Sequence, residues 1–480
     1  MKIAICASEV VPFAKTGGLA DVAGALPLAL EELGGDVVVA MPRYKTIEDS
    51  KFIIQRLKDG TSYSTIGKNI NPVRNTKALT GKNKISNGVK VYFIENDKYF
   101  NRPGLYGEKT GDYIDNLDRF SYYCRRTLAL LKEINFQPDI IHCHDWQTAL
   151  IPVYLKTLYK DNPFYKNIKT VLTIHNIGYQ GLFSREEFPK LGLDWDFFNM
   201  ETIEFYGKIN ILKGGIVFSD VINTVSPTYS KEIQTKEFGY GLEGILSKRR
   251  DSVFGILNGL DYSIWNPETD KFIVKNYSIE NIQDKYKNKE DLQKICKLPP
   301  KLDVPLFGIV SRLAEQKGFD ILCSCLERIR KMNLQLVILG TGDLKYHTML
   351  EGIAKKYPKV ISLHLKFDDC LAHKIYAGSD IFLMPSKYEP CGLGQMISLR
   401  YGTLPLVFKT GGLADTVTQG QNGFVFENYK KEDLIKTIEK AIQVFQDKEK
   451  WTALTQKAMQ YNFSWKDSAK NYLQMYEKAR

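Results

Sequence analysis

The heptapeptide Lys-Thr-Gly-Gly-Leu-Ala-Asp occurs twice in this chain of 480 residues, at positions 15–21 and 409–415. Each copy follows an apolar run and precedes a stretch with helical spacing. A Thr-Gly-Gly turn at a helix start leaves backbone N–H groups free, and the missing Cβ atoms let a ligand approach closely. These donors, the positive helix end and the lysine favour an anion. One Gly-Gly turn is more often an ordinary turn, but two identical copies in corresponding positions favour ligand-facing turns.

Two cations lie at the end of the apolar run at residues 306–312 and just after it. Arg312 and Lys317 lie in the segment Ser-Arg-Leu-Ala-Glu-Gln-Lys-Gly. Ligands of open α/β sheets bind beyond the carboxyl ends of the strands. A guanidinium offers a fork of donors and an ammonium offers a point charge, so this pair suits a diphosphate. The spacing alone also fits two solvated surface cations.

A carboxylate, Glu389, follows the run at residues 381–386 in the sequence Glu-Pro-Cys-Gly. At a strand end it could accept hydrogen bonds from sugar hydroxyls or stabilise developing positive charge. The alternative is an exposed loop residue. Pro390, Gly392 and Gly394 favour a constrained loop.

His142, Cys143 and His144 suggest at first a metal site. On a strand, His142 and His144 point to the same face and Cys143 points to the other. The chain has six histidines, and no second Cys/His pair is spaced to complete a tetrahedral set. We therefore expect no metal, and a His144 that contacts substrate or orients Asp145. His175 ends the next apolar run and is either a similar residue or a structural hydrogen-bonding group.

Residues 239–244 match the Gly-x-Gly-x-x-Gly pattern of dinucleotide-binding turns. The pattern follows a charged helical stretch and not a buried strand, so the context that NAD binding requires is missing. The chain also lacks a Gly-x4-Gly-Lys-Ser/Thr phosphate loop and a Gly-x-Ser-x-Gly elbow. We therefore expect no NAD site.

The elements that must hold these residues are short apolar runs that alternate with longer amphipathic stretches. Runs that are apolar throughout predict strands buried on both faces, hence parallel sheets covered by helices in βαβ units. The predicted strands of the first half are residues 2–7, 36–42, 89–95, 139–145, 170–176, 220–225 and 253–259. Those of the second half are residues 306–312, 334–340, 360–365, 381–386, 404–410 and 423–427.

Two domains follow from these two series. Residues 266–304 are rich in Lys, Asn, Asp and Pro and read as a surface linker with a short helix, which sets a boundary near Asn258–Pro267. We assign residues 1–258 to an N-terminal domain and residues 259–462 to a C-terminal domain. Residues 463–480 are predicted to form a closing helix that joins the N-terminal domain, because apolar residues recur there at helical spacing: Trp465, Ala469, Tyr472 and Tyr476.

Composition limits the class of protein. Hydrophobic residues make up 44% and charged residues 25%, as in a globular protein with a sizeable core. There is no apolar run long enough to predict a membrane span, and no signal or transit peptide pattern, so a cytoplasmic protein is expected. Eight cysteines without a Cys-x-x-Cys pair predict reduced thiols. The net charge of +11 without a dense basic block predicts a solvated basic surface and no nucleic-acid partner.

The ordered motifs of the chain resemble those of the bacterial glycogen synthases and plant starch synthases, retaining glycosyltransferases of the GT-B type. The resemblance covers the whole chain and implies an α/β fold of two Rossmann-like, doubly wound parallel-sheet domains that face a central cleft. The motifs are KIAICASEVVPFAKTGGLADV (2–22), YxDNxxRF (113–120), HCHDW (142–146), TIHNIGYQG (173–181), NTVSPTY (223–229), GYGLEG (239–244), GILNGLD (255–261), SRLAEQKG (311–318), SKYEPCGL (386–393), KTGGLAD (409–415) and FSWKDSAKNYLQMY (463–476).

The resemblance implies transfer of glucose from ADP-glucose to the non-reducing 4-hydroxyl of an α-1,4-glucan such as glycogen, with retention and without a cofactor or metal. It implies that His144 holds the glucose O6 and that the catalytic residues are Lys15, His144, Arg312, Lys317 and Glu389. The implied donor-binding residues are Lys15, Gly17, Gly18, Asn258, Arg312, Lys317, Phe367, Glu389, Cys391, Gly392, Leu393, Thr410, Gly411 and Gly412. The implied acceptor contacts are Asp115, Tyr179 and Gln180.

The chain departs from the pattern of this family at two positions. The residue that stacks on adenine, often Tyr in bacterial relatives, is Phe367, which keeps the aromatic face and loses the hydroxyl. Gly394 stands where many relatives have Thr, so only its backbone N–H remains for a contact. Ile397 replaces the second Glu of wider GT-B families, which fits the synthase branch. A related transferase that uses UDP-glucose or another acceptor is therefore the alternative.

Retention at C1 can proceed through a covalent intermediate or through attack on the same face. No carboxylate is an obvious nucleophile, so we expect same-face attack, in which the leaving β-phosphate accepts the proton of the acceptor hydroxyl. Arg312, Lys317 and Lys15 would then stabilise the charge that grows on ADP. A sugar-nucleotide-binding protein without activity would not need these leaving-group cations.

Overall fold

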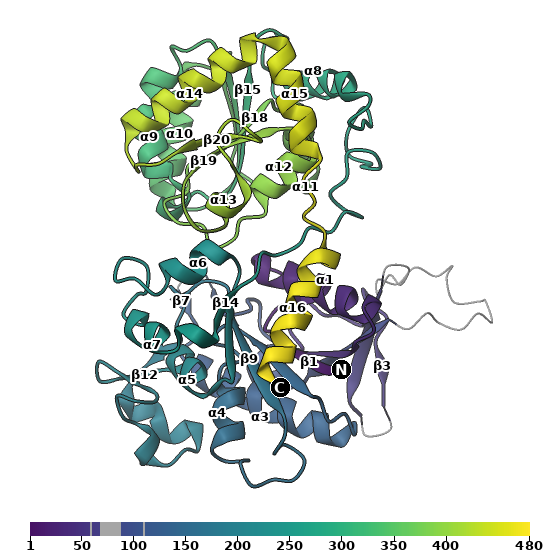
Figure 1. Cartoon of the computed structure of the whole chain (residues 1–480), viewed down its shortest axis with the longest axis vertical. Helices are drawn as coiled ribbons and strands as arrows, with labels where there is room; N and C mark the ends of the chain where they lie inside the picture. Colours follow the sequence, from purple (N-terminus) through teal and green to yellow (C-terminus); the bar gives the residue numbers. More distant parts are fainter. Residues whose placement is uncertain (58–59, 68–87, 109–110) are drawn as a thin grey trace, which may run out of the picture. The chain divides into compact units, whose positions relative to one another are not determined.

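The computed structural model describes residues 1–57, 60–67, 88–108 and 111–480 (Figure 1). The chain divides into two compact units. Unit 1 comprises Met1–Val225, Ser230–Gly259 and Trp465–Arg480, and unit 2 comprises Ser226–Tyr229 and Leu260–Ser464. After the short segment Ser226–Tyr229, the chain enters unit 2 at Leu260 and returns to unit 1 at Trp465.

Unit 1 is built on a nine-stranded sheet in the order β14-β13-β9-β8-β1-β2-β5-β4-β3. The parallel strands are β1 (Lys2–Cys6), β2 (Asp36–Pro42), β5 (Val89–Ile94), β8 (Ile140–His144), β9 (Lys169–Ile174), β13 (Val221–Thr224) and β14 (Val253–Gly255). All of them coincide with predicted strands. The edge strands β3 (Gln55–Arg56) and β4 (Ser62–Ile66) pair antiparallel and were missed, because β3 is short and exposed and β4 is only half-buried.

The helices of unit 1 cover both faces of this sheet (Figure 1). They are α1 (Gly18–Glu32), α2 (Asp97–Phe100), α3 (Asn116–Glu133), α4 (Leu150–Lys156), α5 (Ile211–Phe218), α7 (Glu243–Lys248) and α16 (Trp465–Ala479). Two small antiparallel sheets lie outside the main one. They comprise β10 (Leu182–Phe183), β11 (Glu204–Phe205) and β12 (Lys208–Asn210), and β6 (Gly107–Glu108) with β7 (Gly111–Asp112).

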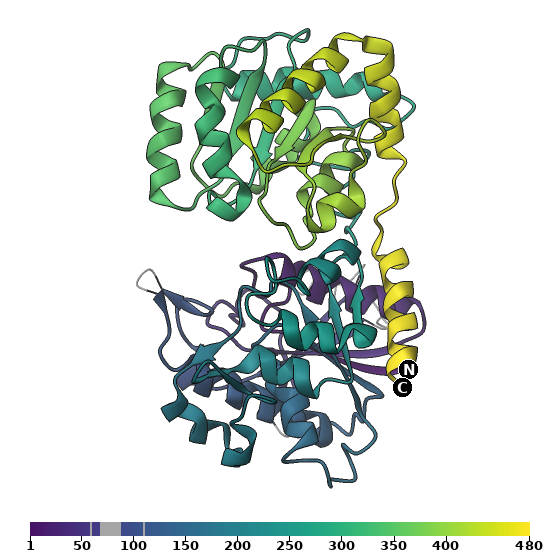
Figure 2. The same ribbon diagram turned by 60° about the vertical axis from the view of Figure 1, so that its left-hand side comes forward.

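The C-terminal helix α16 packs in unit 1, beside α1 (Figures 1 and 2). Its buried face contains the residues that the helical spacing had singled out, Trp465, Ala469, Tyr472 and Tyr476. Gly259 lies directly against its first turn, because a Cβ at this position would be 2.5 Å from the Trp465 Cα. The two ends of the chain therefore belong to one unit.

Unit 2 is built on a six-stranded parallel sheet in the order β17-β16-β15-β18-β19-β20. The strands are β15 (Leu306–Val310), β16 (Gln335–Leu339), β17 (Ile361–His364), β18 (Ile381–Met384), β19 (Leu404–Phe408) and β20 (Phe424–Phe426). Every strand matches a predicted apolar run. This order is that of a Rossmann sheet, in which the chain winds outward in both directions from the first strand. The predicted α/β class with two parallel-sheet domains is confirmed.

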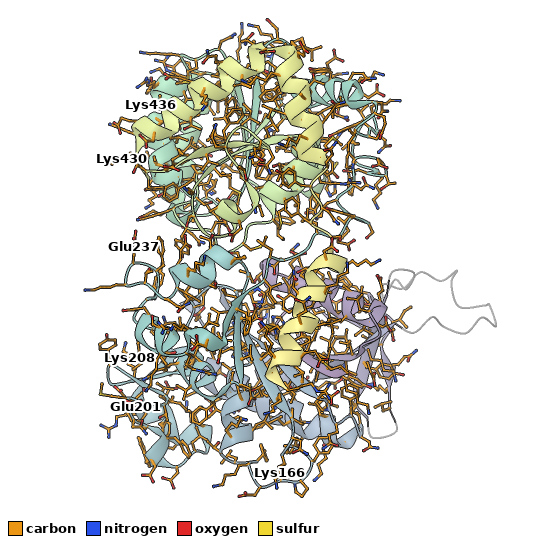
Figure 3. All side chains as sticks on the ribbon, viewed as in Figure 1. Lys166, Glu201, Lys208, Glu237, Lys430 and Lys436 are labelled. Carbon is orange, nitrogen blue, oxygen red and sulfur yellow. The ribbon has the colours of Figure 1, made fainter. Side chains whose placement is uncertain are left out.

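Helices sandwich the sheet of unit 2, with α9, α10 and α14 on one side and α8, α11, α12 and α15 on the other (Figure 1). Their bounds are α8 (Lys285–Ile295), α9 (Phe319–Ile329), α10 (Leu344–Lys356), α11 (Asp369–Gly378), α12 (Gly394–Arg400), α13 (Gly411–Thr416), α14 (Lys431–Gln446) and α15 (Lys448–Met459). A further helix, α6 (Pro227–Glu232), begins within Ser226–Tyr229 of unit 2. Exposed lysines such as Lys430 and Lys436 project outward from this unit (Figure 3).

The interpretation of residues 266–304 as a surface linker is wrong, because this segment is a packed part of unit 2. Lys285 of α8 is buried and donates to the Ala377 carbonyl at 2.7 Å and to Thr403 Oγ1 at 2.7 Å. Lys289 is buried beside Asp380, with 2.7 Å between Nζ and Oδ2. Burial lowers the pKa of Lys285 to about 7. Lysine-rich sequences are normally solvated, so only the partners from distant strands and helices identify this segment as interior.

Within the described ranges, no helix has the length and apolar character needed to cross a membrane. Residues 233–242, which include most of the Gly-x-Gly-x-x-Gly match at 239–244, form turns and bends between α6 and α7, and a helix, not a strand, directly precedes them.

Candidate active site

Each of the two sheets has one point at which the strand order reverses. In unit 1 this point lies between β1 and β8, and in unit 2 it lies between β15 and β18. Open α/β sheets bind ligands beyond the carboxyl ends of the strands at such points. The segments at these ends carry the predicted site residues: Lys15 after β1, His144 at the end of β8, Arg312 and Lys317 after β15, and Glu389 after β18.

A pocket of about 210 Å³ lies at the reversal point of unit 2. Lys317 and Glu389 meet in it, and the ammonium Nζ lies 2.9 and 2.7 Å from the two carboxylate oxygens. Ser386 Oγ donates to Glu389 at 3.0 Å. Five predicted site residues therefore converge here. They are Arg312, Lys317, Glu389, Gly392 and Leu393.

Arg312 is exposed at the mouth of this pocket, and its guanidinium forms no ion pair with any residue in the described part of the chain. The pocket thus has two cations and one carboxylate. Since Lys317 already neutralises Glu389, Arg312 leaves the pocket with an uncompensated positive charge. An anionic ligand would gain most from this arrangement.

The second heptapeptide is pressed against the loop that carries Glu389. A Cβ on Gly411, which has a φ of +42°, would lie 2.0 Å from the Glu389 carbonyl oxygen, and one on Gly412 would lie 2.1 Å from the Cys391 carbonyl oxygen. The Gly412 N–H donates to the Glu389 carbonyl at 3.1 Å. These glycines are therefore required by the close approach of two backbone segments. Thr410 is the N-cap of the short helix α13 that follows.

Two further predicted donor-binding residues of unit 2, Cys391 and Phe367, have different surroundings. Cys391 is buried, and Gln395 Nε2 donates to its carbonyl at 3.0 Å. Gly394 begins α12, where a Cβ would lie 2.9 Å from the Phe382 ring, so the ring of Phe382 occupies the space of the missing side chain. Phe367 follows β17, is 82% exposed and does not line the pocket. It offers an open aromatic face.

The first heptapeptide has different surroundings. Lys15 Nζ lies 2.8 Å from Asp21 Oδ1, so the first and last residues of this copy form an ion pair. No atom outside the immediate chain would meet a Cβ on Gly17 within 4 Å. Gly18 is the first residue of α1. This turn therefore has the open backbone that the second copy lacks.

Sequence reasoning missed Glu9, which occupies the donors of the first turn. Its carboxylate accepts hydrogen bonds from the backbone N–H of Thr16 and from Thr16 Oγ1, the latter at 2.6 Å. The N–H of Gly17 donates to it at 3.3 Å, and Tyr106 Oη donates at 2.6 Å. An internal carboxylate thus takes the position that an anion was expected to fill. No motif spacing indicates the contact between Glu9 and Tyr106, because the two residues are 97 positions apart.

The acceptor candidate Asp115 is bound by a neighbouring arginine. The two terminal nitrogens of Arg102 lie 2.7 and 2.6 Å from its two carboxylate oxygens. The hydrogen bonds from Arg102 hold the pKa of Asp115 below its usual range. Asp115 is also the N-cap residue of α3. Asp115 is therefore ionised, and its two hydrogen bonds with Arg102 fix the carboxylate at the start of α3.

His142 and His144, which are buried, and the half-buried His175 form a row at the carboxyl ends of β8 and β9. The rings of His142 and His144 lie on one face of β8 with centroids 4.2 Å apart, as the strand alternation predicts. His144 Nδ1 lies 2.9 Å from His175 Nε2. Burial lowers the pKa of His142 and of His175 to about 3, and that of His144 also falls well below its usual range. These imidazoles are therefore neutral.

Several buried polar atoms of unit 1 have no hydrogen-bond partner among the described residues. Two of them, His144 Nε2 and Asn258 Oδ1, belong to the predicted donor-binding or catalytic set. A buried polar atom without a partner costs roughly 1–3 kcal/mol. A ligand hydroxyl at either atom would remove this cost.

The other acceptor candidates differ in how accessible they are. Gln180 is buried, accepts from Asn210 Nδ2 at 2.7 Å and donates to the Tyr240 carbonyl at 3.1 Å. It stabilises the loops around β10 and β12. Tyr179 beside it is 54% exposed and open to a ligand.

Asp145 has a φ of +58° and accepts from the His175 N–H at 2.7 Å, and burial raises its pKa to about 7.

Across residues 1–57, 60–67, 88–108 and 111–480, no group of three or more His, Cys, Asp and Glu side chains is arranged to hold a metal ion. All eight cysteines are free thiols.

The chain matches the family model of the starch synthase catalytic domain over residues 2–248 and that of group 1 glycosyl transferases over residues 290–458. Glycogen synthase of Geotalea uraniireducens is 48% identical over 485 residues, which cover 100% of this chain and 99% of that protein. Glycogen synthase of Thermotoga petrophila is 45% identical over 491 residues, with 100% and 99% covered.

Among solved structures, the catalytic domain of starch synthase IV from Arabidopsis thaliana bound to ADP and acarbose is 34% identical, with a TM-score of 0.87. The match covers 100% of this chain and 99% of that one. Sucrose-phosphate synthase from Thermosynechococcus elongatus shares the fold, with a TM-score of 0.62 at 16% identity. Because the similarity to glycogen synthases extends over the full chain and the starch synthase model covers its first half, the chain belongs to the glycogen and starch synthase family of glycosyltransferases.

Proposed function

We propose that this chain transfers the glucosyl group of ADP-glucose to the non-reducing 4-hydroxyl of an α-1,4-glucan, with retention at C1. The observation that supports this most directly is the pocket of unit 2, in which Arg312, Lys317 and Glu389 meet at the strand-order reversal. Two cations and a carboxylate there fit a sugar diphosphate, which has an anionic part and a hydroxylated part. The family membership supplies the reaction class.

ADP is proposed as the leaving group because the starch synthase IV structure was solved with ADP and because Phe367 offers an open ring to a base. Stacking needs only an aromatic face, which Phe provides as well as Tyr. Preference for ADP-glucose over UDP-glucose would then reflect the larger stacking area of a purine.

In unit 2, Arg312 and Lys317 would neutralise the diphosphate and stabilise the charge that grows on it as the bond to C1 breaks. Glu389 holds the Lys317 ammonium in place through both carboxylate oxygens. It would also face the transferred glucose. The loop residues Cys391, Gly392 and Leu393 would line the sugar, supported by the backbone of Thr410, Gly411 and Gly412.

In unit 1, Lys15 would contact the donor diphosphate, together with the backbone of Gly17 and Gly18, and the space around Gly17 is open. This requires the Glu9 carboxylate to share or release the N–H of Gly17, to which it is bonded at 3.3 Å. His144 Nε2 would meet a glucose hydroxyl, and Asn258 Oδ1 would accept from another, since both atoms lack a partner among the described residues. Asp115, Tyr179 and Gln180 are the proposed acceptor contacts.

The proposed reaction is an attack on the same face of the sugar. The C1–oxygen bond to the β-phosphate breaks, the acceptor O4 bonds to C1, and the proton of the 4-hydroxyl passes to the leaving phosphate oxygen. The protein would contribute positioning and charge stabilisation. We propose that the cations do this without a metal, and that the reaction takes place in the cytoplasm, where the eight free thiols would remain reduced.

The decisive experiment is incorporation of labelled glucose into glycogen from ADP-glucose and, in parallel, from UDP-glucose. We expect faster incorporation from ADP-glucose and an α-configured new linkage by NMR. Faster incorporation from UDP-glucose would establish the alternative donor, and no incorporation from either would refute the proposal. Activity that EDTA abolishes and a divalent cation restores would contradict metal independence.

A matched pair of variants separates the pocket from general surface charge. Arg312→Gln removes the unpaired cation at the pocket, whereas Arg328→Gln removes an exposed cation that pairs with Glu439 on the surface of the same unit. We expect only Arg312→Gln to lower the transfer rate. Equal effects of the two substitutions would contradict the assignment of this pocket to the donor.

A further inference from the structure

Two tyrosines of the C-terminal helix reach the histidine row of unit 1. Tyr472 and Tyr476 are fully buried, and their ring centroids lie 5.7 and 5.6 Å from that of His142. Residues four apart lie on the same face of a helix, so α16 directs both rings at the same imidazole. Tyr476 is separated from His142 by 334 residues.

His142 is held at both of its ring nitrogens. Nδ1 lies 2.8 Å from Tyr476 Oη, and Nε2 lies 2.6 Å from Thr173 Oγ1. The ring is neutral, because burial lowers its pKa to about 3, and a neutral imidazole has one donor and one acceptor nitrogen. Both capacities are used by these two contacts. The imidazole therefore cannot rotate without breaking a buried hydrogen bond.

His142 in turn supports one face of His144. The two rings are inclined by 35° with centroids 4.2 Å apart. At the edge of the His144 ring, Nδ1 lies 2.9 Å from His175 Nε2. These contacts fix the direction of the remaining nitrogen, Nε2, which is buried and has no partner among the described residues.

We propose that Tyr476 is a positioning residue that acts through His142 on His144. Its hydroxyl fixes the imidazole of His142, and that ring fixes the plane of His144 and the direction of Nε2. The inference rests on the proposed role of His144 in holding the transferred glucose. It gives the C-terminal helix a part in the reaction, although the helix contributes no residue to the proposed site.

The kinetic test compares two substitutions that each remove one buried hydroxyl from α16. Tyr476→Phe removes the partner of His142 Nδ1, whereas Tyr472→Phe removes a hydroxyl that lies 3.4 Å from Asn223 Nδ2 and on neither nitrogen of His142. We expect Tyr476→Phe to lower kcat about tenfold with KM for glycogen nearly unchanged, because small misplacements of a positioned group cost this much or more. Tyr472→Phe should change kcat less than about twofold. Equal losses in the two variants, or none in Tyr476→Phe, would overturn the proposal.

A second readout uses the ligand-free protein and needs no donor. The chain has only six histidines, so selective ¹⁵N labelling gives a spectrum that single substitutions can assign. We expect the ring nitrogen signals of His142 and His144 to shift in Tyr476→Phe, and those of His144 to stay in place in Tyr472→Phe. Unchanged His144 signals in Tyr476→Phe would refute the coupling. If the unsubstituted protein transfers no glucose, the proposed function fails, but this spectrum still decides the coupling.

Thr173 provides an independent route if Tyr476→Phe does not fold. Thr173→Val removes the partner of His142 Nε2 with little change of shape, and Thr173→Ser keeps the hydroxyl. We expect kcat to fall in Thr173→Val and to be retained in Thr173→Ser. Equal kcat in these two variants would contradict a requirement for a fixed His142 ring.

Discussion

Lys15 and Lys409 begin identical heptapeptides, yet their ammonium groups have different partners. Lys15 pairs with Asp21 of its own copy at 2.8 Å, whereas Lys409 pairs with Glu427 at 2.9 Å on an exposed surface. Each copy ends in an aspartate, and the partners of the two aspartates differ too. Asp21 pairs with Lys15, whereas Asp415 accepts from the Thr228 N–H and hydroxyl at 2.8 and 2.7 Å. At the scale of residues, the surroundings and not the repeated letters decide what each lysine can do.

We therefore predict that Lys15→Ala damages donor use and Lys409→Ala does not. Loss of a charge on the diphosphate should lower kcat/KM for ADP-glucose about a hundredfold. An exposed ion pair such as that of Lys409 contributes little, typically below ~1 kcal/mol, so its loss should change kcat/KM less than about twofold. Steady-state kinetics with varied ADP-glucose measures both, and similar losses in the two variants would contradict the assignment.

Lys317 allows a sharper prediction at the same scale. Lys317→Ala should lower kcat by roughly 10²–10³, as removal of a transition-state charge stabiliser does, while KM for glycogen changes little. Lys387→Ala is the matched control, because Lys387 lies nearby but its Nζ is exposed and 3.5 Å from Glu315. Turnover of Lys317→Ala close to that of the unsubstituted protein would rule out the leaving-group role.

At the scale of elements, the strand pattern was predictable and the turns between strands were only partly so. Each predicted apolar run forms a parallel strand. Strands that are buried on both faces are apolar throughout, so they are recognisable in the sequence as continuous apolar runs. Both heptapeptides also lead into helices, α1 and α13, as predicted. The pattern did not reveal that the glycines of the second turn are required by backbone contact, since this depends on the loop at 389–391.

This difference predicts opposite tolerance to a methyl group in the two turns. Gly412→Ala should lower the free energy of unfolding by about 1–3 kcal/mol, because its Cβ would lie 2.1 Å from the Cys391 carbonyl oxygen. Gly17→Ala should change it by less than about 0.5 kcal/mol, because the site is open and the φ of −152° is ordinary extended backbone. Denaturant unfolding of both variants is the measurement, and equal destabilisation would show that the turns are alike after all.

At the scale of the whole molecule, the two units differ in their buried titrating groups. Unit 1 contains three neutral imidazoles, those of the buried His142 and His144 and of the half-buried His175, and all three have pKa values below the usual 6.5. The unfolded chain binds more protons than the folded one below pH 6.5, so this stability is present above that pH and is lost as pH falls toward about 3. Asp145, with its pKa raised to about 7, acts in the opposite direction and offsets part of the loss.

We accordingly predict that unit 1 loses stability before unit 2 as the pH is lowered from 6.5 to 4.5. Each of these three histidines contributes at most about 1.4 kcal/mol per pH unit, and three histidines against one aspartate leave a net loss. Hydrogen exchange followed by mass spectrometry resolves peptides of the two units, after correction for intrinsic exchange. Earlier loss of protection in peptides from residues 306–426 would contradict this prediction.

The sequence by itself determined the two parallel sheets, the helix starts after the repeated turns and the position of Lys15, His144, Arg312, Lys317 and Glu389 at strand ends, since all of these follow from local patterns and motif order. Only the tertiary structure decided which groups meet. Glu389 with Lys317, Glu9 with Tyr106, the buried Lys285 and Tyr476 with His142 join residues 72 to 334 positions apart. Such contacts depend on how the sheets and helices pack, and neither composition nor periodicity contains that information.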